Sequence, residues 1–250
     1  MVEAARHTTI ENGQWLLPEH VQNPQYVIPD AVLWHVVRRL GLDEPHKIGV
    51  DLMCGNGTIP NFINEVGGCC FGVEIDAAHC KIATAAAAQL LQFSPPAGWL
   101  IGQKPGIVHG DCTTVDLRRN NGEPLRASYI YTSPPFREIL NGTLNKKIAR
   151  AIGTTLVPPG LLGFVLIDSA DEAVRDGAMV NPAAATIAYL RQVGLVLLDR
   201  IAFRIKDAPP GCDDQFTELM FVRQEELNFW GTCNPTPLSG PEKARTWLAA

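Results

Sequence analysis

The stretch Tyr129–Phe136 reads Tyr-Ile-Tyr-Thr-Ser-Pro-Pro-Phe. Its aromatic and β-branched start predicts a buried strand over residues 127–132. The strand has to end at Ser133, because neither of the following prolines has a backbone N–H to donate to a sheet. A hydroxyl, two rigid peptide units with carbonyls outside the sheet and an aromatic ring remain at the strand end. Together these groups could hold a flat molecule that carries an amino group.

Strand and helix patterns alternate on both sides of this stretch. We expect strands at 47–51, 69–75, 107–109, 127–132 and 161–167, helices at 31–40, 58–66, 77–93, 138–156 and 182–193, and a closing hairpin of 195–205 with 216–222. Strands that alternate with helices predict a mostly parallel sheet covered on both faces. The expected fold is α/β and Rossmann-like, with seven strands, an antiparallel edge hairpin and helices on both faces.

The composition is that of an ordinary globular protein. The chain has 250 residues, and we expect one catalytic domain at 26–223, an N-terminal arm or lid at 1–25, a polar loop at 169–180 and a tail at 224–250. Seven cysteines without a C-x-x-C pair indicate neither a disulfide framework nor a zinc site, which favours reduced thiols and an intracellular protein. No apolar run is long enough to span a bilayer.

The charge distribution is uneven. The net charge of −5 is unfavourable for binding nucleic acid, because phosphate contacts need Lys and Arg. Residues 111–206, however, carry 12 basic and 9 acidic residues, and they contain the Ser-Pro-Pro-Phe stretch. The middle of the chain is therefore the only basic part.

Ligands of open α/β sheets bind beyond the carboxyl ends of the strands, where the strand order reverses. The predicted strand ends hold Asp51, Cys54–Gly57, Glu74, Asp111, Ser133–Phe136 and Asp168. Gly55 and Gly57 let a backbone approach a ligand closely. The number of residues between the glycine turn and Glu74 is typical of sites where an acidic residue accepts hydrogen bonds from a ribose diol. Asp111 could accept a hydrogen bond from the exocyclic amine of adenine. These residues favour a nucleoside-bearing cofactor over a simple phosphate.

Several motifs resemble those of class I S-adenosylmethionine-dependent methyltransferases. Val50–Thr58 and Gly72–Asp76 look like the first two motifs of that family, and Gly110–Cys112 is similar to its adenine-contacting motif. Thr132–Phe136 resembles the catalytic tetrapeptide of amino-methyltransferases, in the form most typical of enzymes that methylate cytosine N4. Tyr26–Leu40 resembles the segment that packs over the methionine end of the cofactor.

The resemblance implies S-adenosylmethionine as cofactor, no metal, and methyl transfer to an exocyclic amine, with cytosine N4 of DNA or RNA favoured. The implied cofactor-binding residues are Tyr26, Pro29, Asp51, Met53, Cys54, Gly55, Gly57, Glu74, Ile75, Asp111 and Cys112; the implied catalytic residues are Ser133, Pro134, Pro135 and Phe136. The Ser133 hydroxyl and the Pro134 carbonyl would accept the hydrogens of the amine. Phe136 would stack on a base that is flipped out or single-stranded.

Other functions stay open at this stage. The same chemistry serves adenine N6, guanine N2 and a protein glutamine amide, although glutamine enzymes usually have Asn at the position of Ser133. A catalytically inactive subunit that binds nucleic acid is a further alternative. The segment between Asp111 and the catalytic strand is too short for a target-recognition region that reads duplex DNA. The expected nucleic-acid target is therefore structured RNA or a single strand, or recognition comes from the N-terminal arm, a partner subunit or a second copy of the chain.

Overall fold

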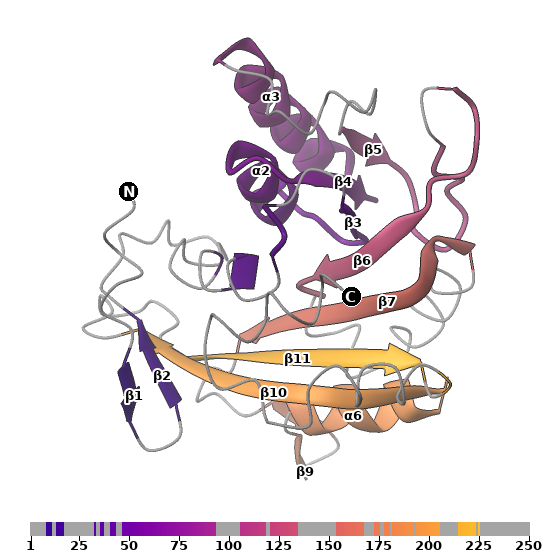
Figure 1. The fold of residues 1–250 in the computed structure, drawn as a ribbon. Helices are drawn as coiled ribbons and strands as arrows, with labels where there is room; N and C mark the ends of the chain where they lie inside the picture. Colours follow the sequence, from indigo (N-terminus) through magenta and orange to yellow (C-terminus); the bar gives the residue numbers. More distant parts are fainter. Residues whose placement is uncertain are drawn as a thin grey trace.

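The computed structural model describes residues 9–11, 14–17, 33, 36–37, 41–43, 47–93, 106–118, 121–134, 154–167, 173–175, 178–180, 182–192, 194–205, 215–223 and 225. Within these ranges the elements are β1 (Thr9–Glu11), β2 (Gln14–Leu17), β3 (Ile48–Asp51), α2 (Thr58–Glu65), β4 (Cys69–Glu74), α3 (Ala77–Phe93), β5 (Ile107–His109), β6 (Ala127–Thr132), β7 (Leu156–Ile167), β8 (Ala173–Arg175), β9 (Ala178–Val180), α6 (Pro182–Arg191), β10 (Leu195–Ile205) and β11 (Gln215–Arg223). Figure 1 shows a twisted main sheet, with α2 and α3 near β3–β5 and α6 near β10, and β8 and β9 form a separate pair.

The main sheet has the order β1-β2-β10-β11-β7-β6-β3-β4-β5. Neighbouring strands from β5 to β7 are parallel, and β11 is antiparallel to both β7 and β10. The seven expected strands and their antiparallel pair are confirmed. The chain runs from β3 outward to β5 and then returns to place β6 on the other side of β3. The strand order therefore reverses between β3 and β6, which is where an open α/β sheet binds its ligands.

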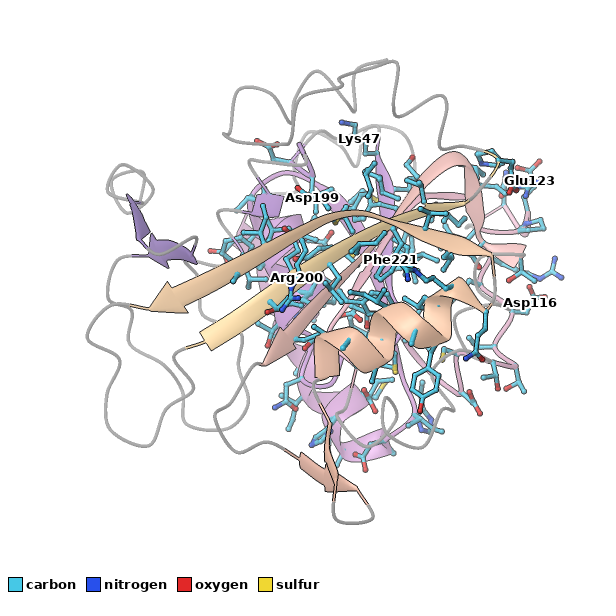
Figure 2. All side chains as sticks on the ribbon, turned by 90° about the horizontal axis from the view of Figure 1, so that it is seen from below. Lys47, Asp116, Glu123, Asp199, Arg200 and Phe221 are labelled. Atoms are coloured by element: carbon cyan, nitrogen blue, oxygen red, sulfur yellow. The ribbon has the colours of Figure 1, made fainter. Side chains whose placement is uncertain are left out.

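The sheet is buried on both faces, which explains the unbroken apolar runs of its central strands. Every residue of β3 and β4 is buried. One face packs against α6, where Ala183 and Leu190 join a core with Phe221 of β11 (Figure 2). The other face packs against α2 through Ile59 and Ile63. The helical residues Leu33, Val36 and Val37 belong to that second core.

Two tyrosines of β6 lie across glycines of the adjacent strands. Tyr129 pairs with Gly49 of β3, and Tyr131 pairs with Gly163 of β7. A Cβ atom on either glycine would overlap the ring of its tyrosine. Both tyrosines are almost completely buried. The two glycines thus make room for aromatic rings that join β6 tightly to both of its neighbours.

Three segments differ from the sequence-based expectation. β7 begins at Leu156, so the helix expected at 138–156 does not reach its predicted end; residues 138–153 lie outside the described part. Leu156 instead pairs with Ala127, and a register shift follows before Leu161 pairs with Tyr129. A partner strand 29 positions away in sequence overrides the local helical pattern.

The expected polar loop at 169–180 contains the short antiparallel strands β8 and β9. Residues of the expected N-terminal arm form β1 and β2, and β2 pairs in parallel with β10. The sheet thus extends beyond the hairpin expected at its edge. The limits of the domain and the roles of arm and tail stay predictions. None of the described helices has the length and apolar character needed to cross a membrane.

Candidate active site

The glycine turn, here residues Met53–Gly57, connects β3 to α2. Gly55 and Gly57 have φ values of 54° and 83°, the left-handed region that other residues rarely adopt. The Cys54 N–H donates to the carbonyl of Val73, so the turn is held against β4. Gly57 is the N-cap of α2 and brings no side chain that could satisfy the first N–H groups of the helix. The turn therefore presents positive backbone dipoles at the carboxyl rim of the sheet.

The two glycines of the turn have different surroundings. A Cβ atom on Gly57 would lie 2.8 Å from the Cβ of Ala83 in α3 and 2.7 Å from the amide nitrogen of Asn61. At Gly55, no described atom lies within 4 Å of the same position. Gly57 is thus needed for packing between α2 and α3, whereas Gly55 leaves backbone open to an approaching ligand.

Glu74, the last residue of β4, is 7% exposed. Its Oε2 accepts the N–H of Gly55 at 2.7 Å, and its Oε1 accepts the N–H of Asp76 at 2.7 Å. Each carboxylate oxygen retains acceptor capacity beyond one bond. Glu74 therefore holds the glycine turn in place and can still accept hydroxyl donors such as a ribose diol. The next residue, Ile75, is 61% exposed and offers an apolar surface beside it.

Asp51, the last residue of β3, is 1% exposed. Its Oδ1 accepts the Thr132 hydroxyl at 2.6 Å and the Met53 N–H at 3.1 Å. Burial raises the pKa of this carboxyl to about 7; the bonds from Thr132 and Met53 act in the lowering direction, and the charge of Glu74 acts in the raising direction. The site thus contains a carboxyl group that changes its charge near neutral pH.

Asp111 lies in the turn after β5, where Thr113 donates its N–H to Oδ1 at 2.8 Å. This contact makes Asp111 a cap of the turn, and its contact with adenine stays a prediction. The next residue, Cys112, is buried. His109 contacts the carbonyl oxygen of Ile75 through Nε2 at 3.1 Å. Sequence reasoning gave no histidine a role, because only the pairing of β5 with β4 brings His109 beside Ile75.

Ser133 and Pro134 directly follow Thr132 at the end of β6, where Ser133 is half-buried and Pro134 is buried. The hydrogen bond from Thr132 to Asp51 places them next to the end of β3 and its glycine turn. The expected site residues Pro135, Phe136, Tyr26 and Pro29 lie outside the described residues. The ends of β6, β3 and β4 thus bring the Ser-Pro pair, Asp51, the glycine turn and Glu74 together, and the roles of these residues stay predictions.

Five cysteines of the described part are free and buried: Cys54, Cys69, Cys70, Cys80 and Cys112. Burial raises the pKa of Cys69 to about 11 and raises the pKa values of Cys54 and Cys70 as well. Cys54, Cys69 and Cys70 therefore stay protonated at neutral pH and act as small apolar side chains, as expected. No group of three or more His, Cys, Asp or Glu side chains suited to a metal ion occurs among the described residues.

One more buried carboxylate, besides Asp51 and Glu74, was missed by sequence reasoning. Glu218 of β11 is 0% exposed, and its Oε1 accepts the hydroxyl of Tyr131 at 3.2 Å. The only sequence signal is a glutamate inside the apolar stretch Phe216–Val222. The bond joins β6 to β11 across the intervening strand β7, over Gly163.

No protein-family model matches the chain, and no curated protein matches it significantly. Solved structures do match. A candidate RNA methyltransferase, PH1948 from Pyrococcus horikoshii, has a TM-score of 0.51 at 14% identity, over 80% of this chain and 86% of that one. Magnesium protoporphyrin IX methyltransferase (ChlM) from Synechocystis with bound SAH has a TM-score of 0.51 at 12% identity, over 78% and 80%.

The [4+2]-cyclase SpnF has a TM-score of 0.55 at 13% identity, over 81% of this chain and 85% of that one. Proteins named for different reactions thus share this architecture, so the fold does not by itself identify the reaction. What the likeness shows is that the chain has the Rossmann-like fold of the class I S-adenosylmethionine-dependent methyltransferases.

Proposed function

We propose that the chain transfers a methyl group from S-adenosylmethionine to an exocyclic amine of a nucleobase, with cytosine N4 as the favoured position. One observation carries this proposal. The reversal of strand order between β3 and β6 brings the glycine turn and Glu74 beside Ser133 and Pro134. A cofactor site and an amine-binding motif at the same rim are what methyl transfer to nitrogen requires.

The described residues fit the proposed cofactor. Gly55 leaves open backbone, Glu74 offers carboxylate oxygens to a ribose diol, and exposed Ile75 offers a surface to a flat base. The start of α2 favours a carboxylate group. When bound, S-adenosylmethionine supplies a methyl group made electrophilic by its sulfonium. The structural neighbour ChlM contains the demethylated product of that cofactor.

The protein's contribution to the transfer would be positioning. The lone pair of an exocyclic amine is delocalised into the ring, which makes the nitrogen a weak nucleophile. The Ser133 hydroxyl and the Pro134 carbonyl would accept the hydrogens of the amine. These hydrogen bonds would localise the lone pair on the nitrogen and direct it toward the methyl group. Phe136 would stack on the base. The transfer would form the carbon–nitrogen bond as the sulfur–carbon bond breaks, and the nitrogen would then give one proton to solvent.

We favour cytosine because Thr132–Phe136 resembles the motif of enzymes that methylate cytosine N4. The short segments around the site bear on the second question, which is the kind of polynucleotide. With only residues 112–126 between Asp111 and β6, we expect a single-stranded or flipped-out base in RNA or DNA, presented with the help of a partner subunit or a second copy. A candidate RNA methyltransferase among the structural neighbours is compatible with RNA, and ChlM shows that the fold also serves a small-molecule methyltransferase.

The decisive experiment incubates the chain with methyl-labelled cofactor and, separately, single-stranded DNA, duplex DNA and total RNA. Mass spectrometry of the digested nucleosides then identifies the product. We expect N4-methylcytidine or its deoxy form. Methyl-adenine or methyl-guanine would replace the cytosine assignment, and absence of transfer to all three would overturn the proposal.

Two substitutions test the catalytic roles. Ser133→Ala and Phe136→Ala should lower transfer by about 100-fold or more, because each removes a contact that orients the base. Calorimetry should show nearly unchanged affinity for S-adenosylhomocysteine. Ser128→Ala is the matched control, since Ser128 is half-buried on the same strand but outside the site. Full activity of Ser133→Ala would refute the catalytic assignment.

A further inference from the structure

Thr132 connects the two strand ends that meet where the sheet reverses its order. Its side chain is fully buried, and its hydroxyl donates to Oδ1 of Asp51 at 2.6 Å. The same oxygen accepts the N–H of Met53, which begins the glycine turn. A single carboxylate oxygen therefore links the turn to the residue that directly precedes Ser133.

A second buried hydrogen bond lies on the opposite face of β6 and connects this strand to β11. The hydroxyl of Tyr131 donates to Glu218 of β11 at 3.2 Å. Because strand residues alternate between faces, Tyr131 and Thr132 fix the same strand end from two sides. Only the Thr132 bond reaches the glycine turn, so Tyr131 provides a comparison within the same strand.

The strength of the Thr132 bond depends on the charge of Asp51. A hydroxyl donates more strongly to a carboxylate than to a neutral acid. Burial brings the pKa of Asp51 to about 7, and the described groups that interact with it are Thr132, Met53, Glu74, Cys54 and Cys70. The two thiols have raised pKa values and are neutral, which leaves Glu74 as the charged neighbour. The Met53 N–H and the Thr132 hydroxyl share Asp51 Oδ1 as acceptor, so a ligand bound at the turn would lie one hydrogen bond away from that acceptor.

We propose that Thr132 is a positioning residue that couples occupation of the glycine turn to the placement of Ser133 and Pro134 through Asp51. The inference rests on the proposed function and adds a connection between its two halves. Without the hydrogen bond from Thr132 to Asp51, cofactor binding would not affect the positions of Ser133 and Pro134. With this bond, a bound cofactor holds Ser133 and Pro134 where they can accept the hydrogens of the amine.

The test compares Thr132→Val, which removes the hydroxyl at nearly constant volume, with Thr132→Ser, which keeps it, and with Tyr131→Phe. S-adenosylhomocysteine affinity is measured by calorimetry from pH 5.5 to 8.5, and single-turnover transfer is measured at saturating cofactor. Loss of the donor removes an interaction that favours the charged form of Asp51. In Thr132→Val, the pH at which affinity changes should therefore rise by about one unit.

Thr132→Val should also lower transfer at saturating cofactor by about 10- to 100-fold. Thr132→Ser should restore both properties, and Tyr131→Phe should retain both within about threefold. An unchanged pH midpoint or a normal transfer rate in Thr132→Val overturns the inference while leaving the proposed function intact. No S-adenosylhomocysteine binding by the unaltered chain overturns both.

If Thr132→Val does not fold, Asp51→Asn tests the coupling through the Asp51 carboxylate instead. Asparagine keeps an Oδ1 acceptor for Thr132 and Met53 but does not titrate. The pH dependence of S-adenosylhomocysteine affinity between pH 6 and 8 should then disappear. Retention of the original midpoint in Asp51→Asn would refute the coupling through this carboxylate.

Discussion

Two buried carboxylates, Asp51 and Glu74, accept N–H groups from the same glycine turn. Asp51 accepts from Met53 and Glu74 accepts from Gly55. Both residues are predicted to serve the cofactor, and what the structure shows is that they hold the turn in shape. Substitutions that delete the carboxyl group would therefore disturb fold and binding together, and amide substitutions separate the two effects more cleanly.

Asp51→Asn should change how stability depends on pH. The pKa of Asp51 is raised from 3.8 to about 7 by burial, so the folded chain holds a proton that the unfolded chain releases. The stabilising contribution is complete below pH 4 and is lost as the pH rises to 7, by up to about 4 kcal/mol. Asp51→Asn should flatten this slope in urea unfolding from pH 4 to 8. An unaltered slope would contradict the raised pKa.

Glu74→Gln should weaken S-adenosylhomocysteine binding by about 10- to 100-fold, because an amide nitrogen replaces one of the two acceptor oxygens. The same change leaves one backbone N–H of Gly55 or Asp76 facing a donor, so stability should fall by about 1–3 kcal/mol. Calorimetry and urea unfolding measure the two effects. Glu65→Gln, at an exposed position of α2, is the control and should change neither.

The two glycines of the turn between β3 and α2 separate packing from ligand access. Gly57 packs against Ala83 of α3, whereas no atom of the described residues lies near the Cβ position of Gly55, although both glycines have positive φ. A glycine pattern in a sequence does not distinguish these roles, because the distinction depends on where α3 lies. The approach of α3 to the turn is a tertiary contact.

Gly57→Ala should destabilise the fold by about 2–4 kcal/mol, since overlap with Ala83 adds to backbone strain. Gly55→Ala should cost only about 1–2 kcal/mol, from left-handed backbone strain alone. Its larger effect should be on S-adenosylhomocysteine affinity, because the new methyl group occupies ligand space. Urea unfolding and calorimetry on both variants check the contrast. Equal stability losses would contradict it.

The residues proposed to bind the cofactor and the base lie at the ends of β3, β4 and β6, and the pair β10–β11 lies farther along the sheet. Binding at the reversal of strand order should therefore stabilise one part of the sheet more than another. At a concentration of 100 Kd, S-adenosylhomocysteine should stabilise the folded state by about 2.7 kcal/mol.

Hydrogen exchange with and without S-adenosylhomocysteine should show where this stabilisation acts. We expect slower exchange in residues 51–57, 74–76 and 130–133, with little change in 197–202 and 217–221. Guanosine at the same concentration serves as a control nucleoside. Protection confined to the β10–β11 pair would place the ligand elsewhere.

Much of the fold was predictable because its signals are local. The double proline after Ser133 ends β6, the glycines after Asp51 end β3, and apolar runs mark strands covered on both faces. The resemblance also identified Asp51, Glu74 and Ser133, which the structure brings to one rim. The start of β7 at Leu156 was not predictable in this way, because pairing with Ala127 decides it.

By itself, the sequence determined the order of β3 to β7, β10 and β11 and of α2, α3 and α6, and which residues end β3 and β6, since chain termination and periodicity act over a few neighbours. Only the tertiary structure decided the contacts between strand ends. Thr132 meets Asp51 across 81 positions, and Tyr131 meets Glu218 across 87. Both bonds depend on strand order, and the Tyr131 bond depends also on the space left by Gly163; neither is encoded within one segment. The coupling that we propose between the glycine turn and Ser133 rests on contacts of this second kind.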